Sequence, residues 1–261
     1  MRPVALTIAG ADPSGGAGLQ ADLVTFAAFG VHGAAVVTAL TAQNTRGVQA
    51  IAAVDPAFVA AQLDAVLPDL APSAAKTGML YTAAVVNTVA ERLKARPLPV
   101  LVVDPVVAAT SGATLLDAAG IAALRARLLP LATLVTPNLR EAEILVGRPV
   151  ADRSAMRDAA RALVDLGARA ALVTGGHLSG DAIDVLFDGG ALHEYAAPRV
   201  PTPRGTHGTG CVLSAAITAG LAVGRPLTEA VAAAKRHVTG ALAAAPAIGH
   251  GTPPLDLLYR G

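Results

Sequence analysis

Short apolar runs typical of buried strands alternate along most of the sequence with longer segments of helical periodicity. Val4–Ala9 is such a run, and Leu19, Leu23, Phe26 and Phe29 then recur at helical spacing. The further strands that we expect are residues 34–40, 48–54, 100–106, 133–137 and 171–176, and the further helices are residues 56–67, 83–95, 118–129 and 154–167. A strand–helix–strand repeat implies parallel strands joined by right-handed crossovers. We therefore predict an α/β fold with a mostly parallel central sheet that helices cover on both faces.

One segment departs from this alternation. Residues 182–197 form two strand-like runs around Gly189 and Gly190, the pattern of a β-hairpin at a sheet edge. Two helices, roughly residues 209–223 and 227–245, are expected to follow it. The sequence shows no repeat and no linker rich in proline and serine, so we expect one three-layer α/β/α domain over residues 1–261.

Composition narrows the classes of function. Apolar residues make up 53% of the chain and charged residues 15%, enough for a large core. The net charge is +1 and the basic residues form no block, so nucleic acid is not an expected partner. No uninterrupted stretch of about 20 apolar residues predicts a membrane span. The single cysteine, Cys211, excludes an internal disulfide framework, and the N-terminus lacks signal-peptide features, so we expect a cytoplasmic protein.

Two glycine-containing segments are candidates for phosphate contacts, although the two common glycine-rich phosphate motifs are absent. Gly10–Gly18 follows the first strand, and its glycines fit either close approach of a ligand or a flexible loop. Gly208 and Gly210 stand where a helix is expected to begin. The first N–H groups of a helix have no internal partner, so this end can hold an anion. The alternative is a plain helix start with Thr209 as its N-cap.

Cys211 lies in the first turn of the same expected helix. That position lowers the pKa of a thiol, so we expect thiolate to be accessible near neutral pH. A thiolate there can accept a proton from a substrate hydroxyl or attack an acyl group. The alternative is that Cys211 is a small buried side chain with no chemical role.

Polar residues follow two of the expected strands. Asn138 and Glu141 have the spacing of a capping box, in which Glu141 reaches back to the helix start. The same two residues stand at a strand end, where they can face a magnesium–phosphate complex. Asp104 ends another strand, the edge where α/β sheets hold ligands, although a polar strand terminus is an equally simple interpretation.

Taken in order, these segments resemble one family. The motifs are TIAGADPSGGAGLQADL, TALTAQNT, KTGML, VVDPV, TSG, TPNLREAEIL, GGH and THGTGC, and they run over nearly the whole chain. In this order they resemble the hydroxymethylpyrimidine/phosphomethylpyrimidine kinases of thiamine biosynthesis, within the ribokinase-like superfamily. The resemblance implies a ribokinase-like fold, ATP and Mg²⁺ as cofactors, and a homodimer. It also implies two successive phosphorylations, of a pyrimidine alcohol and then of its monophosphate.

The resemblance also implies roles for individual residues. The residues placed at the pyrimidine are Gly10, Asp22, Gln43 and Met79; those placed in an anion hole for the transferred phosphoryl group are Gly208, Thr209 and Gly210; and those placed at the metal and the ATP phosphates are Asp104, Asn138 and Glu141. The amide of Gln43 offers a donor and an acceptor to an aminopyrimidine edge, although a polar loop residue would also satisfy this position. Cys211 takes the place of the general base.

One position departs from the pattern, and several alternatives stay open. Thr174 stands where the family often has lysine, so Lys76 or Lys235 is a candidate replacement cation near ATP. A pyridoxal or pyridoxine kinase, including a dual-substrate enzyme, is the nearest alternative function. A non-catalytic pyrimidine-binding module and a cysteine hydrolase activated by His207 are the others. Residues 108–114 are a candidate lid because they are rich in Gly, Ser and Thr.

Overall fold

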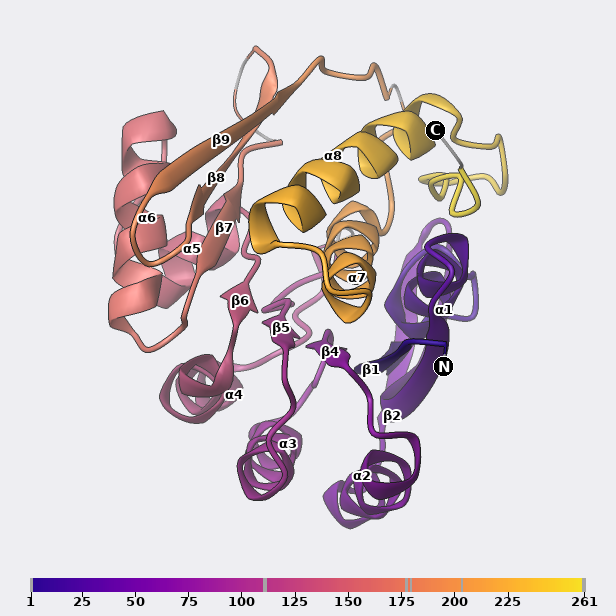
Figure 1. Cartoon of the computed structure of the whole chain (residues 1–261). Helices are drawn as coiled ribbons and strands as arrows, with labels where there is room; N and C mark the ends of the chain where they lie inside the picture. The colour runs from indigo at the N-terminus through magenta and orange to yellow at the C-terminus, as the bar shows by residue number, and fades with distance from the viewer. Residues whose placement is uncertain (1, 110–111, 177, 179, 203, 260–261) are drawn as a thin grey trace.

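A computed structural model describes residues 2–109, 112–176, 178, 180–202 and 204–259. Over these residues one mixed sheet lies between two layers of helices (Figure 1). The strands are β1 (Val4–Ala11), β2 (His32–Asn44), β3 (Gly47–Ala53), β4 (Ala74–Thr77), β5 (Leu101–Val103), β6 (Leu134–Val135), β7 (Ala171–Thr174), β8 (Ala182–Phe187) and β9 (Leu192–Ala197). The helices are α1 (Gly18–Ala28), α2 (Pro56–Leu70), α3 (Ala83–Ala95), α4 (Ala118–Ala123), α5 (Leu139–Val146), α6 (Arg153–Asp165), α7 (Thr209–Ala222) and α8 (Leu227–Ala243). The predicted three-layer α/β fold is confirmed.

The centre of the sheet is parallel and both edges are antiparallel. In the described chain the strand order is β3-β2-β1-β4-β5-β6-β7-β8-β9. The six strands in the run β2-β1-β4-β5-β6-β7 pair in parallel. At the two edges, β3 pairs with β2, and β8 pairs with β7 and β9, in antiparallel fashion. The predicted edge hairpin is β8–β9. A second hairpin, β2–β3, lies at the opposite edge and was not predicted. The strand order reverses at β1, which places a crevice at the carboxyl ends of the strands.

Alternate residues of the central strands face two separate cores. Leu101 and Val103 pack into the core under α2, α3, α5 and α6, whereas Val102 between them packs against α7 and α8. Figure 1 shows these two groups of helices on opposite faces of the sheet. Successive strand side chains point to opposite faces, so a strand buried on both sides reads as a continuous apolar run.

Polar side chains mark where several helices begin. Asp55, Thr82 and Asp152 each accept a hydrogen bond from a backbone N–H of the first turn that follows. Such caps satisfy donors that have no partner inside the helix.

Strand β4 is an addition to the predicted strands. It has four residues, all buried, and one of them is Lys76. A charged residue within so short a run breaks the apolar pattern by which strands are found. The site described below explains how the lysine is accommodated.

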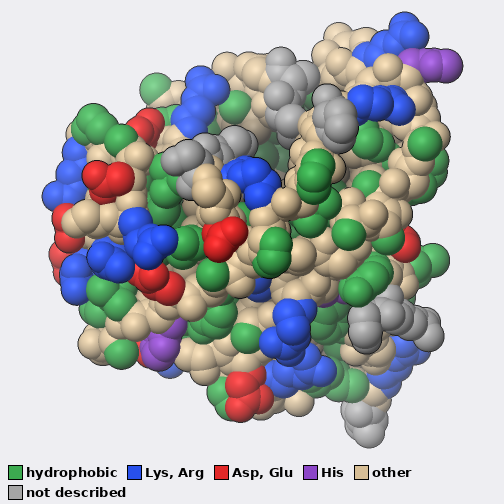
Figure 2. Space-filling view, turned by 90° about the horizontal axis from the view of Figure 1, so that it is seen from above, with side chains coloured by type: hydrophobic (Ala, Val, Ile, Leu, Met, Phe, Trp, Pro, Cys, Tyr) green, Lys and Arg blue, Asp and Glu red, His purple; other side chains and the backbone are tan. Residues whose placement is uncertain are grey.

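Two further observations concern the length of the helices and the charges on the surface. In the part of the chain that the structure describes, no helix combines the length and the apolarity needed to cross a membrane. Figure 2 shows basic and acidic side chains both present on the face that it displays, in keeping with a net charge of +1.

Candidate active site

Two cavities adjoin at the carboxyl ends of the parallel strands. The first has a volume of about 170 Å³, and its wall includes Gly10, Gln43, Met79 and Cys211. The second has a volume of about 300 Å³ and lies toward β8, β9 and α8. Residues Asn138, Thr174 and Gly210 belong to the walls of both cavities. A group bound in one cavity therefore lies next to a group bound in the other.

The amino end of α7 stands between the two cavities. Gly208 is the N-cap, with a left-handed φ of 86°, and a Cβ at this position would collide with the carbonyl oxygen of Gly16. The alternative that Thr209 is the cap is wrong, because Thr209 is already the first residue of α7, and its hydroxyl donates to Thr206 Oγ1 at 3.0 Å. The cap contributes no side chain, and among the described residues no side chain caps the helix, so the first N–H groups of α7 can bind an anion.

Cys211 lines the first cavity in the first turn of α7. The prediction of a lowered pKa is wrong for this protein: desolvation raises the pKa of the thiol to about 12, although the charge of Lys76 and an N–H of Gly18 act in the opposite direction. A helix terminus favours the thiolate, whereas burial disfavours it. The charges of Asp104 and Asp22 add to the effect of burial, so the two together outweigh the helix terminus. The resting form of Cys211 is the thiol.

Lys76 is the cation beneath the first cavity. Its side chain is fully buried, and its ammonium lies 2.8 Å from Asp22 Oδ1 and 3.9 Å from Asp104 Oδ2. Desolvation alone would lower the pKa of Lys76, but the charge of Asp22, the hydrogen bond to Asp22 and the charge of Asp104 raise it, so the side chain stays charged. Strand β4 can contain a lysine because these partners replace water.

Asp22 and Asp104 hold different places around that lysine. Asp22 lies behind the cavity wall, fully buried, where it also accepts a hydrogen bond of 2.6 Å from Thr7 Oγ1. Asp104 lines the cavity and accepts a bond of 2.8 Å from Ser214 Oγ. The structure therefore places Asp104 where a ligand can reach it and Asp22 one layer below.

Asn138 and Glu141 confirm the capping box that their spacing predicts, while their role at a magnesium–phosphate complex stays a prediction. They form a capping box, since Glu141 N donates to Asn138 Oδ1 at 3.0 Å and Asn138 N donates to Glu141 Oε2 at 2.9 Å. Both also line the first cavity. Desolvation and the nearby charge of Asp104 raise the pKa of Glu141 to about 8. The capping box thus fixes the direction in which a buried carboxylate lines the first cavity.

The surroundings of Glu141 suit a cation. Burial also raises the pKa of Asp104, and Thr136 Oγ1, which is buried in the same wall, has no hydrogen-bond partner among the described residues. Two carboxylates that disfavour each other's charge, beside an unpartnered hydroxyl, fit a hydrated Mg²⁺, which keeps most of its waters and needs few carboxylates. Over the described residues no cluster of three or more His, Cys, Asp or Glu side chains is arranged to hold a metal directly.

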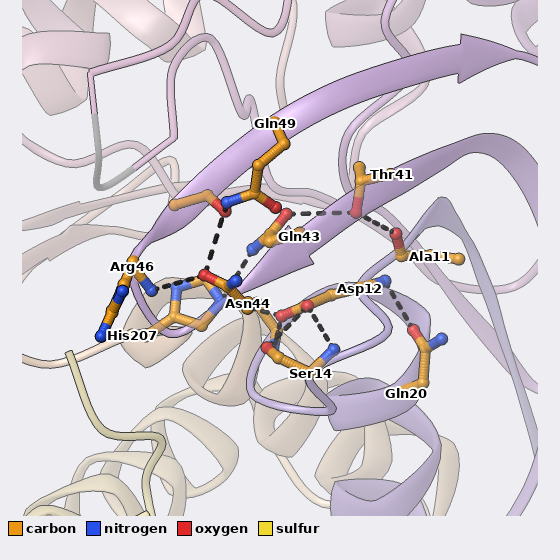
Figure 3. A network of polar contacts seen from close by, with 12 residues as sticks. Ala11, Asp12, Ser14, Gln20, Thr41, Gln43, Asn44, Arg46, Gln49 and His207 are labelled. Carbon is orange, nitrogen blue, oxygen red and sulfur yellow. Dashed lines mark hydrogen bonds and ion pairs between the residues drawn. The ribbon is translucent and has the colours of Figure 1, made fainter. Parts of the chain in front are cut away.

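The remaining wall of the first cavity contains three of the residues assigned to the pyrimidine. A Cβ on Gly10 would lie 3.0 Å from Met79 Sδ, so glycine at this position lets the Met79 side chain pack closely against the strand. Gln43 projects from β2 toward His207 and Thr41 (Figure 3). The structure therefore brings together Gly10, Met79 and Gln43, three of the four residues that the resemblance assigns to the pyrimidine, and leaves Asp22 outside this wall.

The second cavity holds two basic side chains along with Thr174. Lys235 projects from α8 and pairs with Asp184 Oδ2 at 2.7 Å, and Asp184 is the strand partner of Thr174. Arg199 also lines this cavity and donates to the carbonyl oxygens of Gly176 and Gly180. Of the two candidate replacements for the missing lysine, Lys235 lies in this cavity and Lys76 in the other.

Two predicted features lie partly outside the described residues. In the candidate lid, residues 108–114, Ala108 pairs with Thr114 in an antiparallel bridge, and residues 110 and 111 are not described. His177 of the GGH motif is also outside the described part. The lid stays a prediction.

His207 is the contact that the sequence did not reveal. The sequence suggests it only as an activator of Cys211, but its Nε2 lies 2.8 Å from Asp12 Oδ2 and 3.0 Å from the amide of Gln43. It thereby joins the loop before α7 to the ends of β1 and β2 (Figure 3).

Known proteins resemble this chain over most of its length. The family model described as phosphomethylpyrimidine kinase matches residues 12–256. A hydroxymethylpyrimidine/phosphomethylpyrimidine kinase of Rhizobium meliloti is 51% identical over 264 aligned positions, covering 100% of this chain and 98% of that protein. The thiamine biosynthesis bifunctional protein ThiED of Geobacter sulfurreducens is 50% identical over 96% of this chain, which spans 51% of that protein's length. The solved structure of an ADP complex of Bacillus subtilis pyridoxal kinase has a TM-score of 0.90 at 37% identity, with 98% of this chain and 97% of that chain covered.

Proposed function

The chain belongs to the phosphomethylpyrimidine kinase family, and from that premise we propose that it phosphorylates 4-amino-5-hydroxymethyl-2-methylpyrimidine and then the resulting monophosphate, with ATP as donor. The observation that carries this proposal is the position of the amino end of α7. Gly208 and Cys211 line the first cavity, Thr209 lines the second, and Gly210 lines both. The first cavity fits the acceptor and the second fits the nucleotide, so the transferred phosphoryl group passes the helix terminus.

The first phosphorylation joins the hydroxymethyl oxygen to the γ-phosphorus of ATP and breaks the bond to ADP. The N–H groups of Thr209, Gly210 and Cys211 are positioned to stabilise the charge on the transferred group. We assign the hydroxyl proton to Cys211. Because its thiol has a pKa of about 12, only a small fraction is thiolate. Only the thiolate can accept the proton, so this fraction limits the rate of the first phosphorylation.

The second phosphorylation has a different nucleophile. The attacking atom is an oxygen of the monophosphate, which is already ionised near neutral pH. This step therefore needs the same anion-binding helix terminus and has less need of Cys211. The same cavity serves both steps because the pyrimidine contacts stay constant while the acceptor atom changes.

We further assign magnesium to Asp104 and Glu141 through water, with Thr136 Oγ1 as a nearby oxygen donor. Bound magnesium would neutralise charge on the ATP phosphates. In the nucleotide cavity, Lys235 supplies the cation that Thr174 lacks, by turning from Asp184 toward a phosphate.

We propose that the protein acts in the cytoplasm as a homodimer, each chain being one kinase domain. A reducing compartment suits a single cysteine in the active site. Leu40 on β2 is 53% exposed and Phe58 on α2 is 63% exposed, and large exposed apolar side chains near a sheet edge suit a subunit contact.

A pyridoxal kinase is the second candidate function, because the solved Bacillus subtilis pyridoxal kinase has a TM-score of 0.90 to this chain. The deciding experiment measures kcat/KM for the pyrimidine alcohol and for pyridoxal at saturating ATP and Mg²⁺. A higher value for the pyrimidine supports the proposal. A higher value for pyridoxal would move the protein to the second function, and no turnover with retained pyrimidine binding would favour a non-catalytic module.

A further inference from the structure

A single nitrogen of His207 stands between an acid and an amide. His207 Nε2 lies 2.8 Å from Asp12 Oδ2 and 3.0 Å from one end of the Gln43 amide, while the other end of that amide lies 3.2 Å from Thr41 Oγ1 (Figure 3). The His207 side chain is 14% exposed and that of Asp12 is 4% exposed. Water therefore competes little for these bonds, and the hydrogens on the four side chains must be mutually consistent.

Asp12 is an ionised acceptor. It accepts hydrogen bonds from Ser14 N at 2.9 Å, from Ser14 Oγ at 2.7 Å and from Ala17 N at 3.0 Å, in addition to its contact with His207. Desolvation acts to raise the pKa of Asp12, but the hydrogen bonds from His207 and Ser14 outweigh it and lower the pKa. A carboxylate needs a donor opposite it, so His207 Nε2 carries a hydrogen.

Thr41 fixes the other end of the amide. Its hydroxyl has one hydrogen, and the carbonyl oxygen of Ala11 lies 2.9 Å away as an acceptor. A carbonyl oxygen cannot donate, so the Thr41 hydrogen goes to Ala11 and Thr41 Oγ1 is left as an acceptor toward Gln43. The amide of Gln43 therefore meets a donor at the His207 end and an acceptor at the Thr41 end.

We propose that His207 is a positioning residue for substrate specificity, because with Asp12 and Thr41 it sets which end of the Gln43 amide is oxygen and which is nitrogen. The oxygen and nitrogen of an amide have nearly the same shape, so hydrogen-bond partners decide the orientation. Figure 3 is drawn with nitrogen toward His207. The hydrogens of the neighbours require the amide to be turned over, with oxygen sharing the His207 hydrogen and nitrogen donating to Thr41.

The orientation matters for the substrate edge, and here the inference rests on the proposed function. A 4-aminopyrimidine presents an amino donor beside a ring-nitrogen acceptor, and the free lone pair and free N–H of the fixed Gln43 amide form the matching pair. A 4-oxo analogue presents the reverse order, an oxygen acceptor beside a ring N–H donor. A fixed amide discriminates between the two, whereas an amide that can turn over accommodates both.

The test compares 4-amino-5-hydroxymethyl-2-methylpyrimidine with its 4-oxo analogue by kcat/KM, in wild type and in three variants. His207→Ala removes the donor, His207→Gln keeps an N–H near the same position, and Thr41→Val removes the acceptor at the other end. His32→Ala is the matched control, since His32 is an exposed histidine at the amino end of β2, away from the site. Melting curves establish that each variant is folded.

We expect the wild type to prefer the amino substrate. His207→Ala and Thr41→Val each reduce this preference by about tenfold or more, because the Gln43 amide can then turn over and is no longer forced to mispair with the 4-oxo analogue. His207→Gln restores part of the preference, and His32→Ala leaves it unchanged. If His207→Ala proves unfolded, Thr41→Val alone decides.

Two results would overturn the inference while leaving the proposed function intact. One is a wild type that phosphorylates both pyrimidines equally well. The other is a loss of activity in the variants that is equal for both substrates, which is what a merely structural role predicts. Failure of the proposed function is distinct, since a wild type that phosphorylates pyridoxal and neither pyrimidine refutes both.

Discussion

Replacing Lys76 by methionine removes the cation on which the floor of the active site depends. Lys76 is fully buried and contacts Asp22 at 2.8 Å, so the substitution leaves a buried carboxylate without its counter-charge. Loss of one partner of a buried ion pair costs about 3 to 5 kcal/mol of unfolding free energy. We expect a loss of this size for Lys76→Met, measured by urea denaturation followed by far-UV circular dichroism.

A second substitution separates charge from packing. Asp22→Asn in the Lys76→Met background removes the unpaired carboxylate and keeps a hydrogen-bonding group for Thr7. We expect the double variant to regain most of the lost stability, because a buried pair replaced by uncharged groups is often close to neutral. Lys94→Met is the control, since Lys94 is exposed on α3.

The pH dependence gives an independent check. In Lys76→Met the carboxylate of Asp22 is buried without a cation, so its folded pKa lies above its unfolded value. A group of this kind contributes stability at low pH that is lost as the pH rises through the folded pKa. The deficit of the variant should therefore shrink as the pH is lowered. A deficit below about 1 kcal/mol, or a double variant no better than the single one, would refute the reasoning.

Three further outcomes follow from the site. Gly208→Ala should abolish both phosphorylations, because its Cβ would collide with Gly16 and displace the start of α7; turnover within about tenfold of wild type would contradict the anion-site assignment. Cys211→Ala should slow the first phosphorylation by about a hundredfold and the second much less, measured with each acceptor separately; equal losses would remove the base assignment. The pKa of Glu141 is raised from 4.5 to about 8, so its contribution to stability is complete below 4.5 and is lost as the pH rises through about 8. Glu141→Gln should flatten this decline in melting temperature, and an unchanged slope would count against a buried carboxylate in the resting enzyme.

Most of the fold was predictable because its signal is local. The apolar periodicity of each strand and helix lies within a few residues, so the parallel centre and the β8–β9 hairpin could be predicted. Strand β4 could not, because Lys76 interrupts its four residues and is itself buried only through Asp22 and Asp104. The lysine becomes compatible with a strand through partners that are distant in the sequence.

The candidate site also combines features that the sequence predicts with features that it does not. The capping box of Asn138 and Glu141 could be predicted from spacing, and so could the glycine start of α7. The pKa of Cys211 could not, because its desolvation depends on how several elements close around it. The contacts of His207 with Gln43 and Asp12 span 164 and 195 residues, a separation at which sequence spacing gives no signal.

The most direct test of the account is a mass-resolved time course with the pyrimidine alcohol as the only acceptor, ATP and Mg²⁺ in excess, and the Gly208→Ala variant in parallel. The account predicts that the wild type forms the monophosphate first, that the diphosphate follows as the monophosphate declines, and that the variant forms neither. No phosphorylated pyrimidine from the wild type, under conditions in which it phosphorylates pyridoxal, would contradict it.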